Sequence, residues 1–466
     1  MISRYKTLLN DTLIFAIGSI GTKMILFFMV PLYTNYMTSA EYGTADLIFT
    51  IAQLLTSFLS VVIFDAVIRF GLSSDNKREE VLLVGFIILG FSAIVGLLIM
   101  PIIEMYKIIS GWKWYIYIYV LLSILYSIEF NYLKVINKNK TFISLNILQT
   151  GMMACLNMYF LVSKSLGIQG YLLAYILSTL FVDIIVFIKE KLWQDLIVAQ
   201  FNKFLFWDML FFSAPLILNN VSWWVINSSD KVMVELMLSA TALGIYTAAA
   251  KIPALINVIV SIFQQAWGIS AVREFETSND NKYYSDVLKY LFLFTSGVCM
   301  VFVTIIKIFI HYYVGSEFAD SWRYVPLLLV SAVFSSVASY YGSMYGALKK
   351  SVNNMLTTLL AALFNIGINW VLIPHIGIWG AVIGTVVSYI VVAFARMLDV
   401  NRYIKISVKW QTFFPTCSII VIHAVVVSLD INIYISSTIA LLAFILINMC
   451  DLKCLTYTLV KSLKRL

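Results

Sequence analysis

Charged residues are scarce in this sequence. Asp, Glu, Lys and Arg together make up 12% of its 466 residues, whereas 61% are hydrophobic. Soluble globular proteins carry about 25% charged residues. This shortage excludes a soluble globular protein, and apolar runs long enough to cross a bilayer recur along the whole chain. We therefore predict an all-α, polytopic membrane protein.

Cysteine and histidine are also few. The five cysteines lie in or beside apolar runs without a Cys-x-x-Cys pair, and only three histidines occur. This pattern argues against a disulfide framework or a metal site. Phosphate-binding glycine loops of the Walker or Rossmann type are missing as well. We expect no cofactor, no metal and no catalytic residues, so an ion gradient, the membrane potential or the substrate gradient would drive any transport.

The sequence is instead rich in apolar stretches of membrane-spanning length. We expect fourteen spans, near 11–37, 43–70, 80–103, 114–136, 142–163, 168–189, 207–237, 242–270, 287–312, 323–346, 353–373, 378–399, 408–428 and 433–451. Most Lys and Arg residues lie at the two termini and in every second loop, such as Lys138, Lys140 and Lys191. By the positive-inside rule, both termini face the cytoplasm, as an even number of spans requires.

The second half of the chain repeats the first. The segment that begins at Lys140 and contains Gly167 and Gly170 recurs 210 residues later, with Lys350, Gly377 and Gly380 at the matching positions. Ser178 and Ser388 match in the same frame. Six spans per copy give both copies the same orientation. They should therefore be related by a pseudo-twofold axis along the membrane normal, with a substrate site between them.

The repeat predicts four parts of the chain. These are an N-terminal six-helix lobe at 1–190, a cytoplasmic interfacial linker at 191–206, a C-terminal six-helix lobe at 207–400, and two additional helices with a cytoplasmic tail at 401–466. The linker reads WQDLIVAQFNKFLFW, a pattern typical of a short amphipathic helix at the membrane surface. The loops on the opposite side are too short for a catalytic domain.

A polar stripe runs along the span at 207–237. Asn220, Trp224, Asn227 and Lys231 follow at spacings of four, three and four, so they share one helical face, with Asp230 close by. Amide side chains and an indole suit a carbohydrate, because they offer hydrogen bonds to hydroxyls and an apolar face to a sugar ring. The alternative is hydrogen bonding between helices of the bundle.

Further charges lie at bilayer depth. Lys251 is in the eighth span, Lys23 is in the first, and Asp46 and Gln53 share a face of the second. We expect these side chains and Lys231 to line one net basic cavity between the lobes, because charges inside a bilayer usually face a cavity or a partner. Such a cavity suits a phosphate or pyrophosphate group. Local ion pairs or snorkelling to the interface are the alternatives.

Two further carboxylates lie alone in the inner halves of spans. Glu129 is in the fourth span and Asp183 in the sixth. Either could carry a coupling proton.

Several short motifs resemble the polysaccharide branch of the multidrug/oligosaccharidyl-lipid/polysaccharide exporter superfamily, whose members flip O-antigen and capsule repeat units. They are Pro31-Leu32-Tyr33, Glu41-Tyr42-Gly43, Arg69-Phe70, Leu166-Gly167-Ile168-Gln169-Gly170, Asp230-Lys231, Gly244-Ile245-Tyr246 and Lys251-Ile252. The resemblance implies alternating access and a polyprenyl-pyrophosphate-linked oligosaccharide as substrate. Related lipid II flippases use basic residues of spans one and eight, which Lys23 and Lys251 match. Lysine replaces the usual arginine there, so bidentate phosphate binding is not expected.

Three hypotheses follow from the sequence. The first is a flippase, not an enzyme, that acts in the bacterial inner membrane for surface polysaccharide synthesis. It would be a monomer surrounded by membrane lipids, with H⁺ or Na⁺ as coupling ion. Its partner would be a polysaccharide polymerase, and it would bind no nucleic acid. The second is a cation-coupled multidrug antiporter of the same superfamily, which would need an acidic cavity. The third is a membrane enzyme of the polysaccharide polymerase type, which the short outer loops disfavour.

Overall fold

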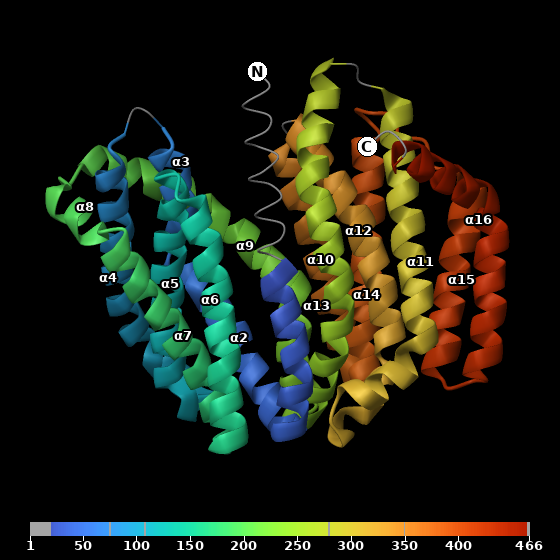
Figure 1. Cartoon of the computed structure of the whole chain (residues 1–466), viewed down its shortest axis with the longest axis horizontal. Helices are drawn as coiled ribbons and strands as arrows, with labels where there is room; N and C mark the ends of the chain where they lie inside the picture. The colour runs from blue at the N-terminus through green and yellow to red at the C-terminus, as the bar shows by residue number, and fades with distance from the viewer. Residues whose placement is uncertain (1–19, 74–75, 107–108, 278–279, 349, 464–466) are drawn as a thin grey trace. The chain divides into compact units, whose positions relative to one another are not determined.

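The computed structural model describes residues 20–73, 76–106, 109–277, 280–348 and 350–463. In these ranges the chain forms helices and no strands (Figure 1). Thirteen of the described helices are long and apolar enough to cross a membrane, and residues 20–36 form one more helix. The expected first span, 11–37, lies partly outside the described residues. The all-α polytopic fold is confirmed.

The long helices follow the expected spans closely. In chain order they are α2 (Ser39–Leu59), α4 (Arg78–Met105), α5 (Lys113–Val135), α6 (Asn139–Asn157), α7 (Gly167–Lys189), α9 (Lys203–Met237), α10 (Ala240–Thr277), α11 (Asn281–Tyr313), α12 (Val325–Leu348), α13 (Ser351–Ile376), α14 (Ile378–Val400), α15 (Trp410–Ser428) and α16 (Ile433–Leu463). A short helix, α8 (Leu192–Val198), lies in the segment where the sequence predicts an amphipathic helix.

The chain divides into two compact units, which we call the N-terminal unit (1–224) and the C-terminal unit (225–466). The division falls inside α9, so this helix belongs to both units. In the N-terminal unit, α5 packs against α2, α4 and α7. In the C-terminal unit, α12 packs against α10, α11, α14 and α15. The four-part domain division drawn from the sequence stays a prediction.

The second expected span, 43–70, is not one helix. It is broken into α2 and α3 (Ile63–Gly71), and Val61 and Val62 at the break have φ angles of 50° and 56°. Left-handed backbone is strained for β-branched residues, so two valines are not expected at such a break. The apolar run also continues through this point, so hydropathy gives no sign of the break. Two hydroxyls support it. Ser92 Oγ donates to the carbonyl of Leu59 (2.7 Å), and Ser60 Oγ accepts from the Val62 N–H (3.1 Å).

The internal repeat is visible in the backbone. Gly167 and Gly377, which the sequence pairs, both have positive φ, at 52° and 63°; Gly167 is the first residue of α7, and Gly377 directly precedes α14. Positive φ favours glycine because it has no Cβ. Three residues on, a Cβ at Gly170 would lie 2.8 Å from Phe160 Cβ, and one at Gly380 would overlap the backbone of Ile373. The α6–α7 and α13–α14 hairpins therefore share a positive-φ glycine and one close approach.

Candidate functional site

The polar stripe of α9 ends in a buried carboxylate of the C-terminal unit. Asp230 is 3% exposed. Its carboxylate accepts hydrogen bonds from the Tyr246 hydroxyl of α10, from Thr385 Oγ1 of α14 (3.2 Å) and from the Lys231 N–H (2.9 Å). Three helices thus converge on one carboxylate. Removing a charge from water is costly, and these hydrogen bonds offset part of that cost.

Two amides of α13 extend this group. Asn365 Oδ1 accepts from Ser229 Oγ (2.9 Å) and from Asn369 Nδ2 (3.1 Å), and both asparagines are fully buried. Asn369 Oδ1 points at Gly384, where any side chain would overlap it, and no described residue donates a hydrogen bond to this oxygen. Gly384 directly precedes Thr385. We call Ser229, Asp230, Tyr246, Asn365, Asn369 and Thr385 the Asp230 cluster.

The Asp230 cluster has the chemistry of a cation site rather than of a catalytic site. It presents carboxylate, hydroxyl and amide oxygens, which are the ligands that hard cations prefer. A buried carboxylate can equally hold a proton. Its hydroxyls donate to the carboxylate inside the packed helices, where Asp230 is 3% exposed, so they fix the position of its oxygens. Its residues fit a small monovalent cation or a proton.

The other predicted site residues lie in both units. Lys23, Asp46, Gln53, Asn220 and Trp224 lie in the N-terminal unit, and Asn227, Lys231 and Lys251 join Asp230 in the C-terminal unit. Asp46 is buried, Gln53 and Asn227 are exposed, and the remainder except Asp230 are half-buried. That these side chains line one cavity stays a prediction.

Two members of the stripe bind groups on other helices of their own unit. The Trp224 indole N–H donates to the carbonyl of Thr50 (2.8 Å), one turn beyond Asp46 on α2. Asn227 Oδ1 accepts from the Tyr389 hydroxyl of α14 (2.8 Å). These contacts are the interhelical hydrogen bonds that the sequence left as the alternative. They also hold both side chains in fixed positions.

Sequence reasoning missed most partners of Asp230. Tyr246 lies in a motif that the sequence singled out, but without a role. Asn365 and Asn369 are four residues apart in an apolar span, so they share a helical face. That spacing is the sequence pattern that could have identified these two asparagines as site residues. Thr385 is one hydroxyl among many in apolar helices, and nothing in the sequence distinguishes it.

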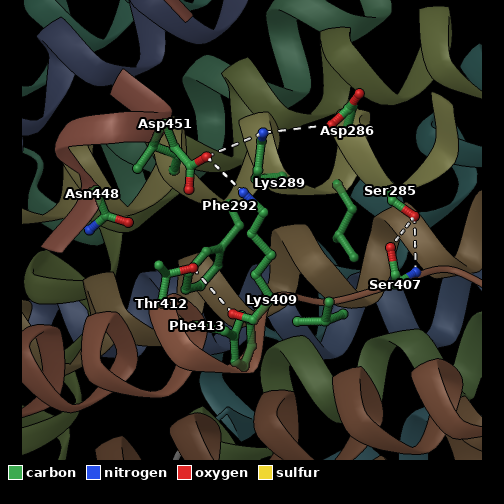
Figure 2. Close-up of a pocket in the computed structure, with 13 residues that line it drawn as sticks. Ser285, Asp286, Lys289, Phe292, Ser407, Lys409, Thr412, Phe413, Asn448 and Asp451 are labelled. Carbon is green, nitrogen blue, oxygen red and sulfur yellow. Dashed lines mark hydrogen bonds and ion pairs between the residues drawn. The ribbon is translucent and has the colours of Figure 1, made fainter. Parts of the chain in front are cut away.

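The C-terminal unit also has a charged pocket that the sequence did not predict (Figure 2). Asp451 of α16 pairs with Lys289 of α11 (3.3 Å) and with Lys409, which precedes α15 (3.4 Å). Lys289 also lies 3.6 Å from Asp286. The pocket floor is apolar and includes Phe292. This network ties the last two helices to α11.

A model of a known protein family matches this chain. A family model described as "Polysaccharide biosynthesis protein" matches residues 8–268, more than half of the chain. No curated protein matches the chain significantly in sequence.

Solved structures show the same fold. The lipid II flippase MurJ in an inward closed conformation matches 96% of this chain and 100% of its own, with a TM-score of 0.70 and 11% identity. The Vibrio cholerae MATE transporter VcmN, as its D35N mutant, matches 86% of this chain and 98% of its own (TM-score 0.58, 16% identity). A MOP superfamily transporter from Pyrococcus furiosus, described as having a binding pocket of reverse polarity, matches 84% and 96% (TM-score 0.58, 16% identity).

Proposed function

Because the chain belongs to the polysaccharide biosynthesis protein family, we propose that it is a flippase for lipid-linked oligosaccharides. The substrate would be a polyprenyl-pyrophosphate-linked repeat unit of a surface polysaccharide, such as O-antigen or capsule, moved from the inner to the outer leaflet of the bacterial inner membrane. The family match over residues 8–268 carries this proposal. The fold shared with a lipid II flippase supports it, because that protein moves a lipid across a membrane.

The proposed site has one role for each kind of side chain. Lys23 and Lys251 would attract the pyrophosphate as point charges. The Asn220, Trp224 and Asn227 stripe would contact the sugar. Asp46, Gln53, Lys231 and Asp230 would complete the polar lining. The protein would perform no covalent chemistry, both termini would lie in the cytoplasm, and a polymerase would consume the delivered repeat unit.

We assign ion coupling to the Asp230 cluster. A carboxylate buried among three helices favours one arrangement of its neighbours when it binds H⁺ or Na⁺ and another when it is empty. This difference can bias an alternating-access equilibrium. The hydrogen bonds from Tyr246 and Thr385 join α9, α10 and α14 at this point. Cation exchange there would therefore alter the packing of three helices together.

A second candidate function is cation-coupled multidrug antiport. The fold match to a MATE transporter favours it. It would require a binding cavity that attracts cationic drugs. The lysines at positions 23, 231 and 251 disfavour this, because they outnumber the aspartates at 46 and 230 among the proposed lining residues.

Complementation of a strain that lacks its own repeat-unit flippase tests the proposal. Wild-type protein should restore surface polysaccharide. Lys251→Glu and Lys23→Glu should each reduce it at least tenfold, because a carboxylate repels pyrophosphate, whereas Lys251→Arg should keep most of it.

Lys164→Glu is the matched control, because Lys164 is an exposed lysine outside the proposed site. It should export normally. Normal export by both Lys23→Glu and Lys251→Glu would disprove the cationic site. Resistance to cationic dyes without restored polysaccharide would favour the drug antiporter.

A further inference from the structure

The N-terminal unit contains two buried carboxyl groups that the proposed substrate site does not use. Glu129 of α5 is fully buried, and Asp183 of α7 is 2% exposed. None of their four carboxyl oxygens has a hydrogen-bond partner among the described residues. Buried acidic side chains are rare without a partner. These two groups therefore need an explanation.

The two carboxyls lie at the same depth on neighbouring helices. Glu129 lies six residues before Val135, where α5 ends, and Asp183 lies six residues before Lys189, where α7 ends. Six residues of helix correspond to about 9 Å. The two helices pack against each other. We call these two buried carboxyls, at equal depth on packed helices, the Glu129–Asp183 pair.

A neutral polar layer borders the pair. The Tyr126 hydroxyl, one turn before Glu129, donates to Asn146 Oδ1 of α6 (2.5 Å). Gln149 of α6 donates to Thr179 Oγ1 of α7 (3.3 Å), one turn before Asp183. These groups can donate to or accept from a guest, but none carries a positive charge.

The charged groups of the surrounding helices pair elsewhere. On α5 itself, Lys134 donates to Asn131 Oδ1 (3.0 Å), and its ammonium lies over the Phe142 ring (4.6 Å to the ring centroid). On α2, Asp46 is itself a buried carboxyl and brings no positive charge.

The charged groups at the start of α4 and the Tyr132 hydroxyl of α5 also have partners outside the Glu129–Asp183 pair. Arg78 of α4 pairs with Glu79 (3.3 Å), while Lys77, just before α4, pairs with Glu80 (3.4 Å). Tyr132 of α5 donates to Asp195 (2.7 Å).

Two adjacent carboxylates cannot both stay ionised in such a place. Burying one unpaired charge is very costly, and a second like charge nearby raises the cost further. A bound cation removes the penalty. The second repeat lacks this feature, since the 210-residue offset places Ala393 opposite Asp183.

We propose that Glu129 and Asp183 form a monovalent-cation site, occupied by H⁺ or Na⁺, separate from the Asp230 cluster. The pair binds one cation between two carboxyls and exchanges it toward the membrane face where α5 and α7 end. Its role as a second coupling site rests on the proposed transport function. Cation binding itself does not.

Infrared difference spectroscopy on the purified full-length protein tests binding without any transport. Wild-type-minus-variant spectra are recorded in choline chloride and again in sodium chloride at constant pH, so that a band unchanged by sodium stays visible. Wild type should show a protonated-carboxyl band that both Glu129→Gln and Asp183→Asn remove. If Na⁺ is the guest, sodium should displace the proton and reduce the band. If H⁺ is the guest, the band should persist in sodium.

Two controls keep the result interpretable. Glu104→Gln changes an exposed carboxylate that pairs with Lys113, and it should leave the band intact. Circular dichroism should show that each variant is folded. An identical spectrum and sodium response in wild type, Glu129→Gln and Asp183→Asn would overturn the site. A band that depends on both residues in a protein that fails to restore polysaccharide would instead disprove the proposed function and leave the cation site standing.

Discussion

At the scale of single residues, Asp230 is the best-defined group of the candidate site. Its carboxylate accepts from Tyr246, Thr385 and the Lys231 N–H, and it is almost completely buried. The hydroxyls that donate to it are themselves inside the helix bundle. Their need for an acceptor links the local chemistry to the stability of the C-terminal unit, because an unsatisfied buried donor costs about 1–3 kcal/mol.

Truncating Asp230 should therefore cost more stability than neutralising it. Asp230→Ala removes the acceptor of the buried Tyr246 hydroxyl, whereas Thr385 Oγ1 keeps the Ala381 carbonyl (2.9 Å), and should lower the free energy of unfolding by about 1–3 kcal/mol. Asp230→Asn keeps a carbonyl acceptor and should cost less while still abolishing ion-coupled transport. Thermal unfolding of purified variants measures the first effect and complementation the second. Equal stability of Asp230→Ala and wild type would contradict this role.

The sequence predicts Asp230 but not its surroundings. A charged residue at bilayer depth is conspicuous in an apolar span, and so is the Asn220–Trp224–Asn227 periodicity. The partners Tyr246, Thr385 and Asn365 become visible only when α10, α14 and α13 are placed against α9. Helix crossing and rotation depend on packing of the whole unit, which a single sequence does not encode locally.

At the scale of elements, the break between α2 and α3 is the least expected feature. Val61 and Val62 both take left-handed backbone, at an estimated cost of about 1–2 kcal/mol per residue. Apolar periodicity predicts one continuous helix there, because hydropathy carries no information about φ. The strain marks a point where this helix bends between two fixed halves.

Relieving this strain should stabilise the protein. Val61 is only half-buried, so Val61→Gly loses little packing and should raise the free energy of unfolding by roughly 0.5–1 kcal/mol. Val301→Gly is the matched control, because Val301 is exposed in the middle of α11 and should lose about 1 kcal/mol. Denaturation in detergent compares them. A lower stability of Val61→Gly than of wild type would show that the break is not strained.

One carboxylate adds an ionic link to the helix packing that attaches α15 and α16. The Asp451 side chain is 11% exposed and forms ion pairs with Lys289 and Lys409. Asp451→Asn should lower stability by about 1 kcal/mol and make the last two helices more accessible to proteolysis. Asp286→Asn removes a weaker and more exposed partner of Lys289 and should change little. Equal protease sensitivity of both variants would contradict this assignment.

At the scale of the whole molecule, the sequence predicts two copies of one helical unit and two further helices. The 210-residue repeat was readable from the sequence because glycines at 167 and 377 meet the same backbone requirement. The charged residues within the spans of both halves could also be identified from the sequence. That these charges line one cavity stays a prediction, because it depends on long-range packing. We propose that this molecule moves a lipid-linked oligosaccharide across a bilayer.

Reconstitution tests that claim most directly. Purified protein in liposomes receives a fluorescent polyprenyl-pyrophosphate oligosaccharide in the inner leaflet, and a membrane-impermeant quencher reports its arrival outside. Wild-type protein should make the label accessible, Lys251→Glu should slow this at least tenfold, and Lys164→Glu should match wild type. A folded wild-type protein that leaves the label as inaccessible as protein-free liposomes do would contradict the account.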